Sequence, residues 1–135
     1  MNEGKLQILV VDDNLDLSAL ISLHLQEEGY GVTVRNDGDS AVAVLERMKV
    51  DLMLLDVRMP VKSGFDVLEE IKTLTNIANR AVPVIMVTAK SELEDIEKAF
   101  ELGAAAYIVK PFRAELLISK IHEVLTETGI IGTVS

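Results

Sequence analysis

The chain alternates short apolar runs with longer stretches in which apolar residues recur every three or four positions. The apolar runs are predicted to be strands, because such runs, bounded by turn residues, are typical of parallel strands that are buried on both faces. The predicted strands are residues 6–11, 32–35, 52–55, 82–87 and 106–109. The second of them alternates apolar and polar residues, which predicts a shorter and more exposed strand.

The stretches between these strands, and the one after the last, have the periodicity of amphipathic helices. The predicted helices are residues 15–28, 41–48, 65–74, 92–102 and 114–126. In the first helix Asn14 is the predicted N-cap. The predicted apolar stripe of that helix, with some scatter, consists of Leu17, Leu20, Ile21, Leu23 and Leu25. Strands that alternate with helices in this way predict an α/β three-layer sandwich with a parallel sheet.

The remaining segments are predicted to be turns and loops. Residues 37–39 are predicted as a turn, and residues 59–64 and 75–80 as loops. Gly64 is expected to supply unusual backbone dihedrals in its loop. Residues 1–128 are predicted to form one domain. Residues 129–135 have no periodicity and are predicted to be a C-terminal tail or the start of a linker.

Composition and charge narrow the class of protein. A chain of 135 residues is long enough for one domain with its own core. The formal net charge of −9 argues against nucleic acid or an anionic membrane as a direct partner. The absence of cysteine excludes disulfides and thiolate metal sites. No apolar segment approaches the length of a membrane span, and the first apolar run ends too early for a signal peptide, which predicts a cytoplasmic protein.

Polar residues that can carry chemistry follow the apolar runs. Asp12 and Asp13 close the first run, Asp56 the third, Thr88 the fourth and Lys110 the fifth. Ligands of open parallel sheets bind in the crevice outside the carboxyl ends of the strands, so these residues are predicted to converge on one rim. Three gathered carboxylates repel one another unless a cation intervenes. Mg²⁺ is the natural ion for such oxygen ligands, with Mn²⁺ as the alternative.

Each of these residues also has an ordinary explanation. Acidic residues after a strand are often solvated loop residues or helix N-caps, and this explanation stays open for Asp12 and Asp13. Asp56 is more specific, because a carboxylate can attack phosphorus and form an aspartyl phosphate. Thr88 would donate its hydroxyl to a phosphoryl oxygen, and Lys110 would neutralise the developing phosphoryl charge.

Other polar side chains are predicted to take no part in this site. His24 and His122 lie within predicted helices and are interpreted as ordinary helix positions. A group of acidic residues is interpreted as a solvated helix face: Glu92, Glu94, Asp95 and Glu97.

Taken together, these features resemble the receiver domain of two-component response regulators, a phosphoacceptor module. The stretches that carry the likeness are 8–14, 51–60, 64–66, 83–89 and 103–112, and every signature position in them is filled. The resemblance covers nearly the whole chain, about residues 6–126. It implies a flavodoxin-like fold, with a five-stranded parallel sheet of order 2-1-3-4-5.

The resemblance also implies a phosphotransfer reaction. Asp56 would accept a phosphoryl group from a phosphohistidine of a partner sensor histidine kinase or histidine phosphotransfer protein. Asp12, Asp13 and Asp56, with the main-chain carbonyl of Arg58, would hold Mg²⁺. The domain would be a signalling phosphoacceptor rather than an enzyme, and it would catalyse only its own phosphotransfer and autodephosphorylation.

The resemblance further implies a switch. Thr88 and Lys110 would contact the phosphoryl group, and Tyr107 would be the aromatic residue that changes rotamer. The output surface would be the fourth helix, the fifth strand and the fifth helix. It would act on a downstream effector protein or on an effector domain of a longer chain. The domain would be a monomer or a phosphorylation-dependent dimer.

Two cationic residues border the predicted site, each two positions beyond a site residue. Arg58 follows Asp56 and Lys90 follows Thr88. In receivers these positions border the path of the water that hydrolyses the aspartyl phosphate. We predict that both side chains fold over the phosphoryl group and hinder that water. The alternative is that both point into solvent and offset local negative charge.

The chain departs from some receivers in one respect. Ala104, Ala105 and Ala106 stand where receivers of the winged-helix transcription-factor class carry acidic residues before the aromatic, so their salt-bridged dimer is not predicted here. No effector domain follows residue 135, which leaves a stand-alone receiver and a receiver from a longer chain as alternatives.

Three other classes fit the sequence less well. A phosphatase of the haloacid-dehalogenase type needs a second Asp two positions after the nucleophile, where this chain has Arg58. A flavodoxin-like cofactor-binding protein needs a phosphate-cradling loop after the first strand, where this chain has the acidic residues 12–13. A degenerate receiver that acts only as a phosphorylation-independent interaction module would not need Asp56, Thr88 and Lys110.

Overall fold

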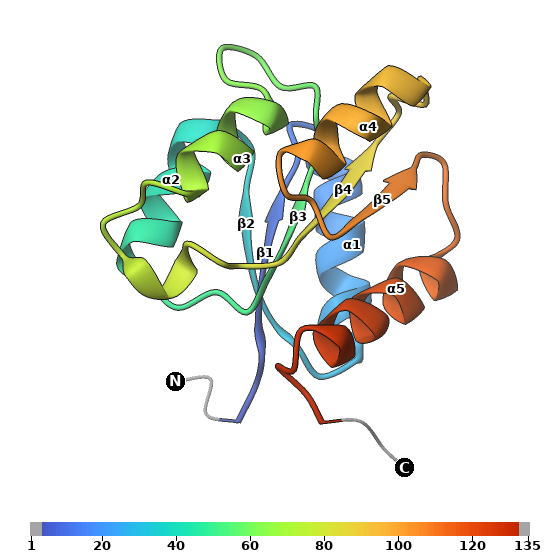
Figure 1. Ribbon diagram of the computed structural model, residues 1–135. Helices are drawn as coiled ribbons and strands as arrows, with labels where there is room; N and C mark the ends of the chain where they lie inside the picture. Colours follow the sequence, from blue (N-terminus) through green and yellow to red (C-terminus); the bar gives the residue numbers. More distant parts are fainter. Residues whose placement is uncertain (1–3, 133–135) are drawn as a thin grey trace.

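A five-stranded parallel sheet lies between two layers of helices in the computed structural model, which describes residues 4–132 (Figure 1). The strands are β1 (Gln7–Val11), β2 (Gly31–Arg35), β3 (Leu52–Leu55), β4 (Val84–Thr88) and β5 (Ala106–Val109). The helices are α1 (Leu15–Glu27), α2 (Gly38–Arg47), α3 (Gly64–Ile71), the 3₁₀-helix η1 (Ile77–Asn79), α4 (Leu93–Glu101) and α5 (Ala114–Glu127). The spatial order β2-β1-β3-β4-β5 confirms the predicted sheet.

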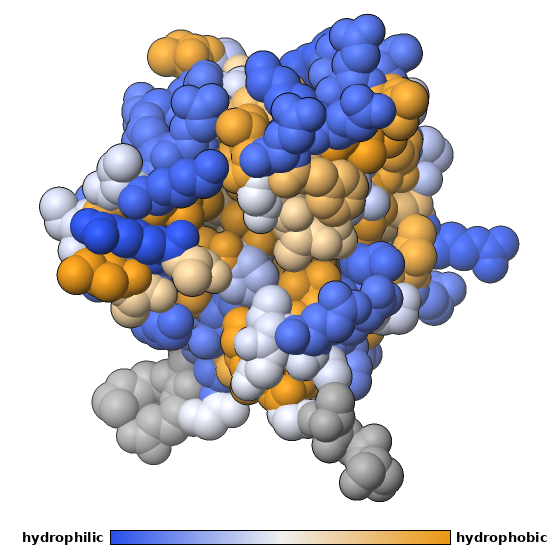
Figure 2. All heavy atoms as spheres, in the orientation of Figure 1, coloured by the Kyte–Doolittle hydropathy of each residue, from blue (hydrophilic) through white to orange (hydrophobic). Residues whose placement is uncertain are grey.

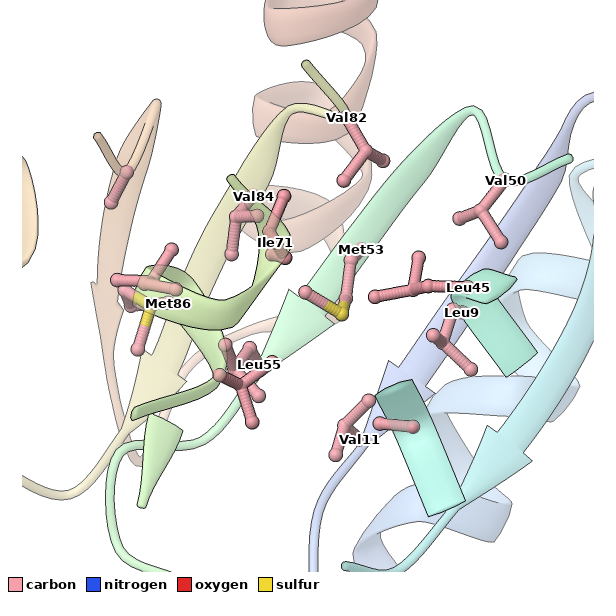
Figure 3. Close-up of a cluster of buried hydrophobic side chains, with 14 of the residues drawn as sticks. Leu9, Val11, Leu45, Val50, Met53, Leu55, Ile71, Val82, Val84 and Met86 are labelled. Carbon is pink, nitrogen blue, oxygen red and sulfur yellow. The ribbon is translucent and has the colours of Figure 1, made fainter. Parts of the chain in front are cut away.

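The central strands are buried on both faces, as the apolar runs predict. Successive residues point to opposite faces of a sheet, so each strand supplies two separate cores. In β3, Leu52 and Leu54 belong to the core under α1 and α5, whereas Met53 and Leu55 belong to the core under α2, α3 and α4. Figure 3 shows the second core, in which side chains of β1, β3 and β4 meet those of the covering helices.

The first helix buries less of its apolar surface than its sequence predicts. Asn14 is the N-cap, as predicted, and its side-chain oxygen accepts a hydrogen bond from the Leu17 amide. Ile21 and Leu25 are buried in the core. Leu20 and Leu23 are 51 % and 52 % exposed, so these two residues of the scattered apolar stripe lie outside the core. One helix face is too narrow for all five apolar residues at these spacings.

Several segments differ from the prediction at their boundaries. Residues 37–39 do not form a free turn, because Asp37 is the N-cap of α2 and the helix starts at Gly38. The stretch 75–80 contains the helix η1, with Asn79 fully buried, rather than a plain loop. Thr88 is the last residue of β4 instead of the first residue after it.

The end of the chain is packed against the domain as far as the structure describes it. Ile130 and Ile131 are half-buried against the core under α1 and α5, and their amides donate to the Leu125 carbonyl oxygen. The rest of the predicted tail, residues 133–135, lies outside the described residues. None of the helices in residues 4–132 has the length and apolar character that a bilayer crossing requires.

Candidate phosphoacceptor site

The carboxyl ends of four strands bring the predicted site residues together. Asp12 follows β1, Asp56 follows β3, and Lys110 follows β5, while Thr88 ends β4. All of these strands run parallel, so their ends meet at one edge of the sheet. Asp12, Asp56 and Thr88 are 2 %, 6 % and 0 % exposed, which places two carboxylates and a hydroxyl in surroundings that favour neutral groups.

Lys110 links the two buried carboxylates. Its Nζ donates to Asp12 Oδ2 at 2.7 Å and to Asp56 Oδ2 at 3.0 Å. Burial alone would lower the pKa of Lys110, but its hydrogen bonds to both carboxylates outweigh this effect and raise the pKa. Burial raises the pKa of Asp12, more than the bond to Lys110 lowers it. Lys110 is therefore held charged between the Asp12 and Asp56 carboxylates.

The acidic residues fit a divalent cation. Asp12, Asp13 and Asp56 each offer a carboxylate oxygen, and these oxygens lie within 4.8 Å of one another. Three ionised carboxylates and the ammonium that is hydrogen-bonded to two of them leave two negative charges within this cluster, while the cationic Arg58 and Lys90 line the same cleft. A hard dication that prefers oxygen ligands matches both the charge and the ligand type, as Mg²⁺ does. The predicted fourth ligand, the main-chain carbonyl of Arg58, stays a prediction.

The loop after β3 holds Asp56 through its main chain. The Arg58 amide donates to Asp56 Oδ1 at 3.2 Å. Gly64 is required for space rather than for dihedrals, which corrects the sequence-based expectation: a Cβ there would collide with the Asp56 main-chain oxygen. The left-handed residue of this loop is Val61, with φ of 69° and a fully exposed side chain.

Two hydrogen bonds connect the site to β5 through Thr88, Lys90 and Tyr107. The Lys90 amide donates to Thr88 Oγ1 at 3.3 Å, and the Tyr107 hydroxyl donates to the Lys90 carbonyl oxygen at 2.8 Å. Burial, followed by the charges of Asp95 and Asp56, raises the pKa of Tyr107 to about 12. Tyr107 thus reaches the segment that follows the buried hydroxyl.

An open cleft of about 420 Å³ lies over these residues, and every predicted site residue except Tyr107 lines it. Arg58 and Lys90 both line this cleft, and their predicted effect on the phosphoryl group stays a prediction. The Arg58 side chain is exposed. The Lys90 ammonium lies 4.0 Å from Asp95 Oδ2 on α4.

The residues that were predicted to take no part in the site do not line this cleft. His24 and His122 lie on α1 and α5, where both border a separate cavity between the two helices. Glu92, Glu94 and Glu97 are exposed, whereas Asp95 is half-buried beside Lys90. Figure 2 shows a largely hydrophilic surface over α4, in agreement with the predicted solvated face.

Two further residues touch the site, and the sequence did not indicate them. The Asn14 amide donates to Asp12 Oδ1 at 2.9 Å. Asn36, which follows β2, donates from Nδ2 to the Asp12 main-chain oxygen at 2.8 Å. An Asn after a strand is also typical of an ordinary turn, so only the contact with residue 12 distinguishes Asn36 from any other turn residue.

The sequence matches the model of a known protein family. A family model described as the response regulator receiver domain matches residues 8–122. The chain belongs to this family. It is a receiver domain of two-component systems, and its cluster of Asp12, Asp13 and Asp56 lies at the ends of β1 and β3.

Relatives of this receiver domain include transcriptional regulators. It is 36 % identical over 123 residues to the probable transcriptional regulatory protein TcrX of Mycobacterium tuberculosis, covering 91 % of this chain and 51 % of that protein. It is 41 % identical over 119 residues to the transcriptional regulatory protein CpxR of Klebsiella pneumoniae, covering 88 % of this chain and 49 % of that protein. The chain thus spans about half the length of these relatives.

Solved receiver domains share the fold. A CheY-like receiver domain protein from Methanospirillum hungatei aligns with a TM-score of 0.86 at 31 % identity, covering 96 % of this chain and all of that one. The receiver domain of the sensor histidine kinase PA1611 from Pseudomonas aeruginosa aligns with a TM-score of 0.81 at 34 % identity, covering 90 % of this chain and 98 % of that one. The latter has a magnesium ion coordinated in its active site cleft.

Proposed function

We propose that Asp56 accepts a phosphoryl group from a phosphohistidine, in a reaction that requires a divalent cation held by Asp12, Asp13 and Asp56. The observation that carries the proposal is the pair of hydrogen bonds from Lys110 Nζ to Asp56 Oδ2 and Asp12 Oδ2. It joins a buried nucleophile, a metal-binding carboxylate and a cation at the end of the sheet, where ligands of this type of fold bind.

The proposed reaction is a phosphoryl transfer from nitrogen to oxygen. An oxygen of Asp56 forms a bond to phosphorus while the bond from phosphorus to the donor imidazole nitrogen breaks, and the electron pair of that bond stays with the imidazole. Positioning and charge neutralisation supply most of the catalysis in such reactions. Mg²⁺, when bound, neutralises charge on the phosphoryl oxygens and on the carboxylates.

Lys110 and Thr88 supply further charge neutralisation and positioning of the phosphoryl group. The Lys110 ammonium can move from the Asp56 carboxylate to a phosphoryl oxygen, since it already lies 3.0 Å from the nucleophile. The Thr88 hydroxyl can donate to another phosphoryl oxygen, and the switch role of Tyr107 through the Lys90 carbonyl contact is part of the same proposal.

Partners follow from this chemistry. The donor is a sensor histidine kinase or a histidine phosphotransfer protein. The output acts through α4, β5 and α5 on an effector protein or on an effector domain, which is supported by the doubled length of the relatives. The cytoplasmic location, the absence of a direct nucleic-acid contact and the monomer or phosphorylation-dependent dimer stay predictions. A phosphorylation-independent module is not favoured, because the acceptor, hydroxyl and ammonium are all present.

Intact-mass measurement tests the proposal. The protein is incubated with acetyl phosphate or phosphoramidate and MgCl₂, and we expect a gain of one phosphoryl group that EDTA and Asp56→Asn both prevent. Asp51→Asn is the matched control, because Asp51 lies at the opposite end of β3, where its carboxylate accepts from the Gln7 amide. A mass gain that persists in Asp56→Asn, or that needs no metal, contradicts the assignment.

A further inference from the structure

Asn36 holds the main chain of a metal-binding residue from a neighbouring loop. It follows β2 directly, and its Nδ2 donates to the Asp12 carbonyl oxygen at 2.8 Å. The same Nδ2 makes a weaker contact of 3.4 Å with the hydroxyl of Ser18, which is buried in α1. The half-buried Asn36 amide therefore spans from β2 to the loop that carries Asp12 and Asp13.

The Asn36 side chain replaces a main-chain hydrogen bond that is missing at the end of the β1–β2 pair. The Asp12 amide donates to the Arg35 carbonyl oxygen at 3.1 Å, which is the last main-chain bond between these strands. In a continuing parallel ladder the next bond would join the Asp12 carbonyl to the amide of residue 37. Asp37 instead leaves the sheet as the N-cap of α2. The Asn36 side chain supplies the lost donor, so the Asp12 carbonyl stays paired.

The peptide group that Asn36 holds joins two of the acidic residues. Neighbouring side chains of a continuing strand point to opposite faces, yet Asp12 and Asp13 both place a carboxylate oxygen in the cluster with Asp56. The orientation of the peptide between residues 12 and 13 decides whether they can do so. Hydrogen bonds hold both the side chain and the main chain of Asp12. Its two carboxylate oxygens accept from the Asn14 amide and from Lys110, and its main-chain oxygen accepts from Asn36.

We infer that Asn36 is a positioning residue for the divalent-cation site, and that it acts through the peptide group between Asp12 and Asp13. The inference rests on the proposed function, because it takes these carboxylates to be cation ligands. Groups that orient metal ligands from outside the coordination sphere change metal affinity by about 10–100-fold when they are removed. Asn36 is not one of the three clustered carboxylates, and its contact is with the main chain of one of them.

Titration of the ¹⁵N-labelled protein with MgCl₂, followed by NMR, tests the inference. We expect Asn36→Ala to raise the Mg²⁺ dissociation constant about tenfold and to shift the Asp13 amide signal in the metal-free protein. Asn76→Ala is the matched control, since Asn76 Nδ2 donates to the Leu45 carbonyl oxygen at 2.9 Å, away from the site. The control should bind Mg²⁺ like the wild type. At saturating MgCl₂, Asn36→Ala should still gain a full phosphoryl group from phosphoramidate.

The outcomes separate the two proposals. An unchanged dissociation constant in Asn36→Ala, with normal binding by the wild type, overturns the role of Asn36 alone. An equal weakening in Asn76→Ala also overturns it, because the effect is then one of general stability. A wild type that binds no Mg²⁺ overturns the metal site and this inference together. If Asn36→Ala does not fold, Asn36→Ser replaces it, because the serine hydroxyl is too short to reach the Asp12 carbonyl.

Discussion

Lys110 Nζ lies 3.0 Å from Asp56 Oδ2, although 54 residues separate them in the chain. The other oxygen of Asp56 accepts from the Arg58 amide, so both oxygens of the acceptor have a partner before any phosphoryl group arrives. Each oxygen keeps a second lone pair that can attack phosphorus, and its existing hydrogen bond weakens as its negative charge is lost. The bond to the ammonium is the one that can be exchanged without moving the backbone, and the lysine can follow the charge onto the phosphoryl group.

Removal of the Lys110 charge should strengthen Mg²⁺ binding while it slows phosphorylation. In Lys110→Met the cluster loses the ammonium that is hydrogen-bonded to Asp12 and Asp56, so the negative charge around a bound dication increases. We expect the Mg²⁺ dissociation constant to fall about fivefold at low salt, and the rate of mass gain with phosphoramidate to fall. Lys120→Met is the control, because Lys120 pairs with Glu123 on α5. Weaker Mg²⁺ binding by Lys110→Met would contradict this electrostatic account.

Neutralisation of Asp12 should stabilise the metal-free fold. Burial raises the pKa of Asp12, and the charge of Asp56 raises it further, so ionisation of Asp12 at neutral pH costs free energy of folding. This cost is absent below the unfolded pKa and grows as pH rises through the folded pKa. We expect Asp12→Asn to melt about 2–4 °C higher in EDTA at pH 7. Asp13→Asn is the control, and it should gain less because Asp13 is exposed. A lower melting temperature for Asp12→Asn would show that its pairing with Lys110 outweighs its burial.

The sheet and the acidic rim were predictable from the sequence, because both follow from local patterns. Apolar runs mark the strands, and the residue after each run marks the rim. Features that depend on contacts across the fold were not predictable. Asn79 looks like a loop residue, but its amide donates to the Leu45 and Met48 carbonyl oxygens and its oxygen accepts from the Val50 amide.

Close approach of distant segments explains the other differences. The need for Gly64 comes from the Asp56 carbonyl that lies against it, and Asn36 is distinguished only by the carbonyl that it meets. The exposed positions Leu20 and Leu23 have the same residue type as their buried neighbour Leu25. Helix periodicity alone is too coarse to separate them when apolar residues nearly surround the helix.

Tyr107 should titrate far above an ordinary tyrosine. Burial, with the charges of Asp95 and Asp56, raises its pKa to about 12. Because the folded value lies above the unfolded one, the contribution to stability is complete below about pH 10 and is lost as pH rises to about 12. Absorbance at the phenolate band in Tyr30→Phe, where Tyr107 is the only tyrosine, should give a midpoint near this value. Asp95→Asn in the same background should lower the midpoint. Titration near pH 10, with the far-ultraviolet circular dichroism intact, would contradict the prediction.

Arg58 and Lys90 should prolong the life of the phosphorylated state. Both line the cleft beside Asp56 and can approach a phosphoryl group there. Exposed or half-exposed ion pairs contribute about 0.2–1 kcal/mol each, which corresponds to about a 1.4–5-fold change in rate per residue. We expect Arg58→Ala and Lys90→Ala each to shorten the phosphoryl half-life by such a factor at fixed Mg²⁺, and the double variant to shorten it further. Arg113→Ala is the control, because Arg113 lies outside the cleft at the start of α5.

Substitution of Asp95 can separate the effect of Lys90 on the phosphoryl half-life from the effect of Arg58. Its carboxylate lies 4.0 Å from the Lys90 ammonium and competes with a phosphoryl group for that charge. Asp95→Asn should therefore free Lys90 and lengthen the half-life, and this gain should vanish when Lys90→Ala is added. Arg58→Ala should leave the gain from Asp95→Asn in place, since among residues 4–132 no hydrogen bond or ion pair joins Arg58 to α4. Half-lives that are unchanged in all these variants would mean that both side chains point into solvent, and the shielding role would be rejected.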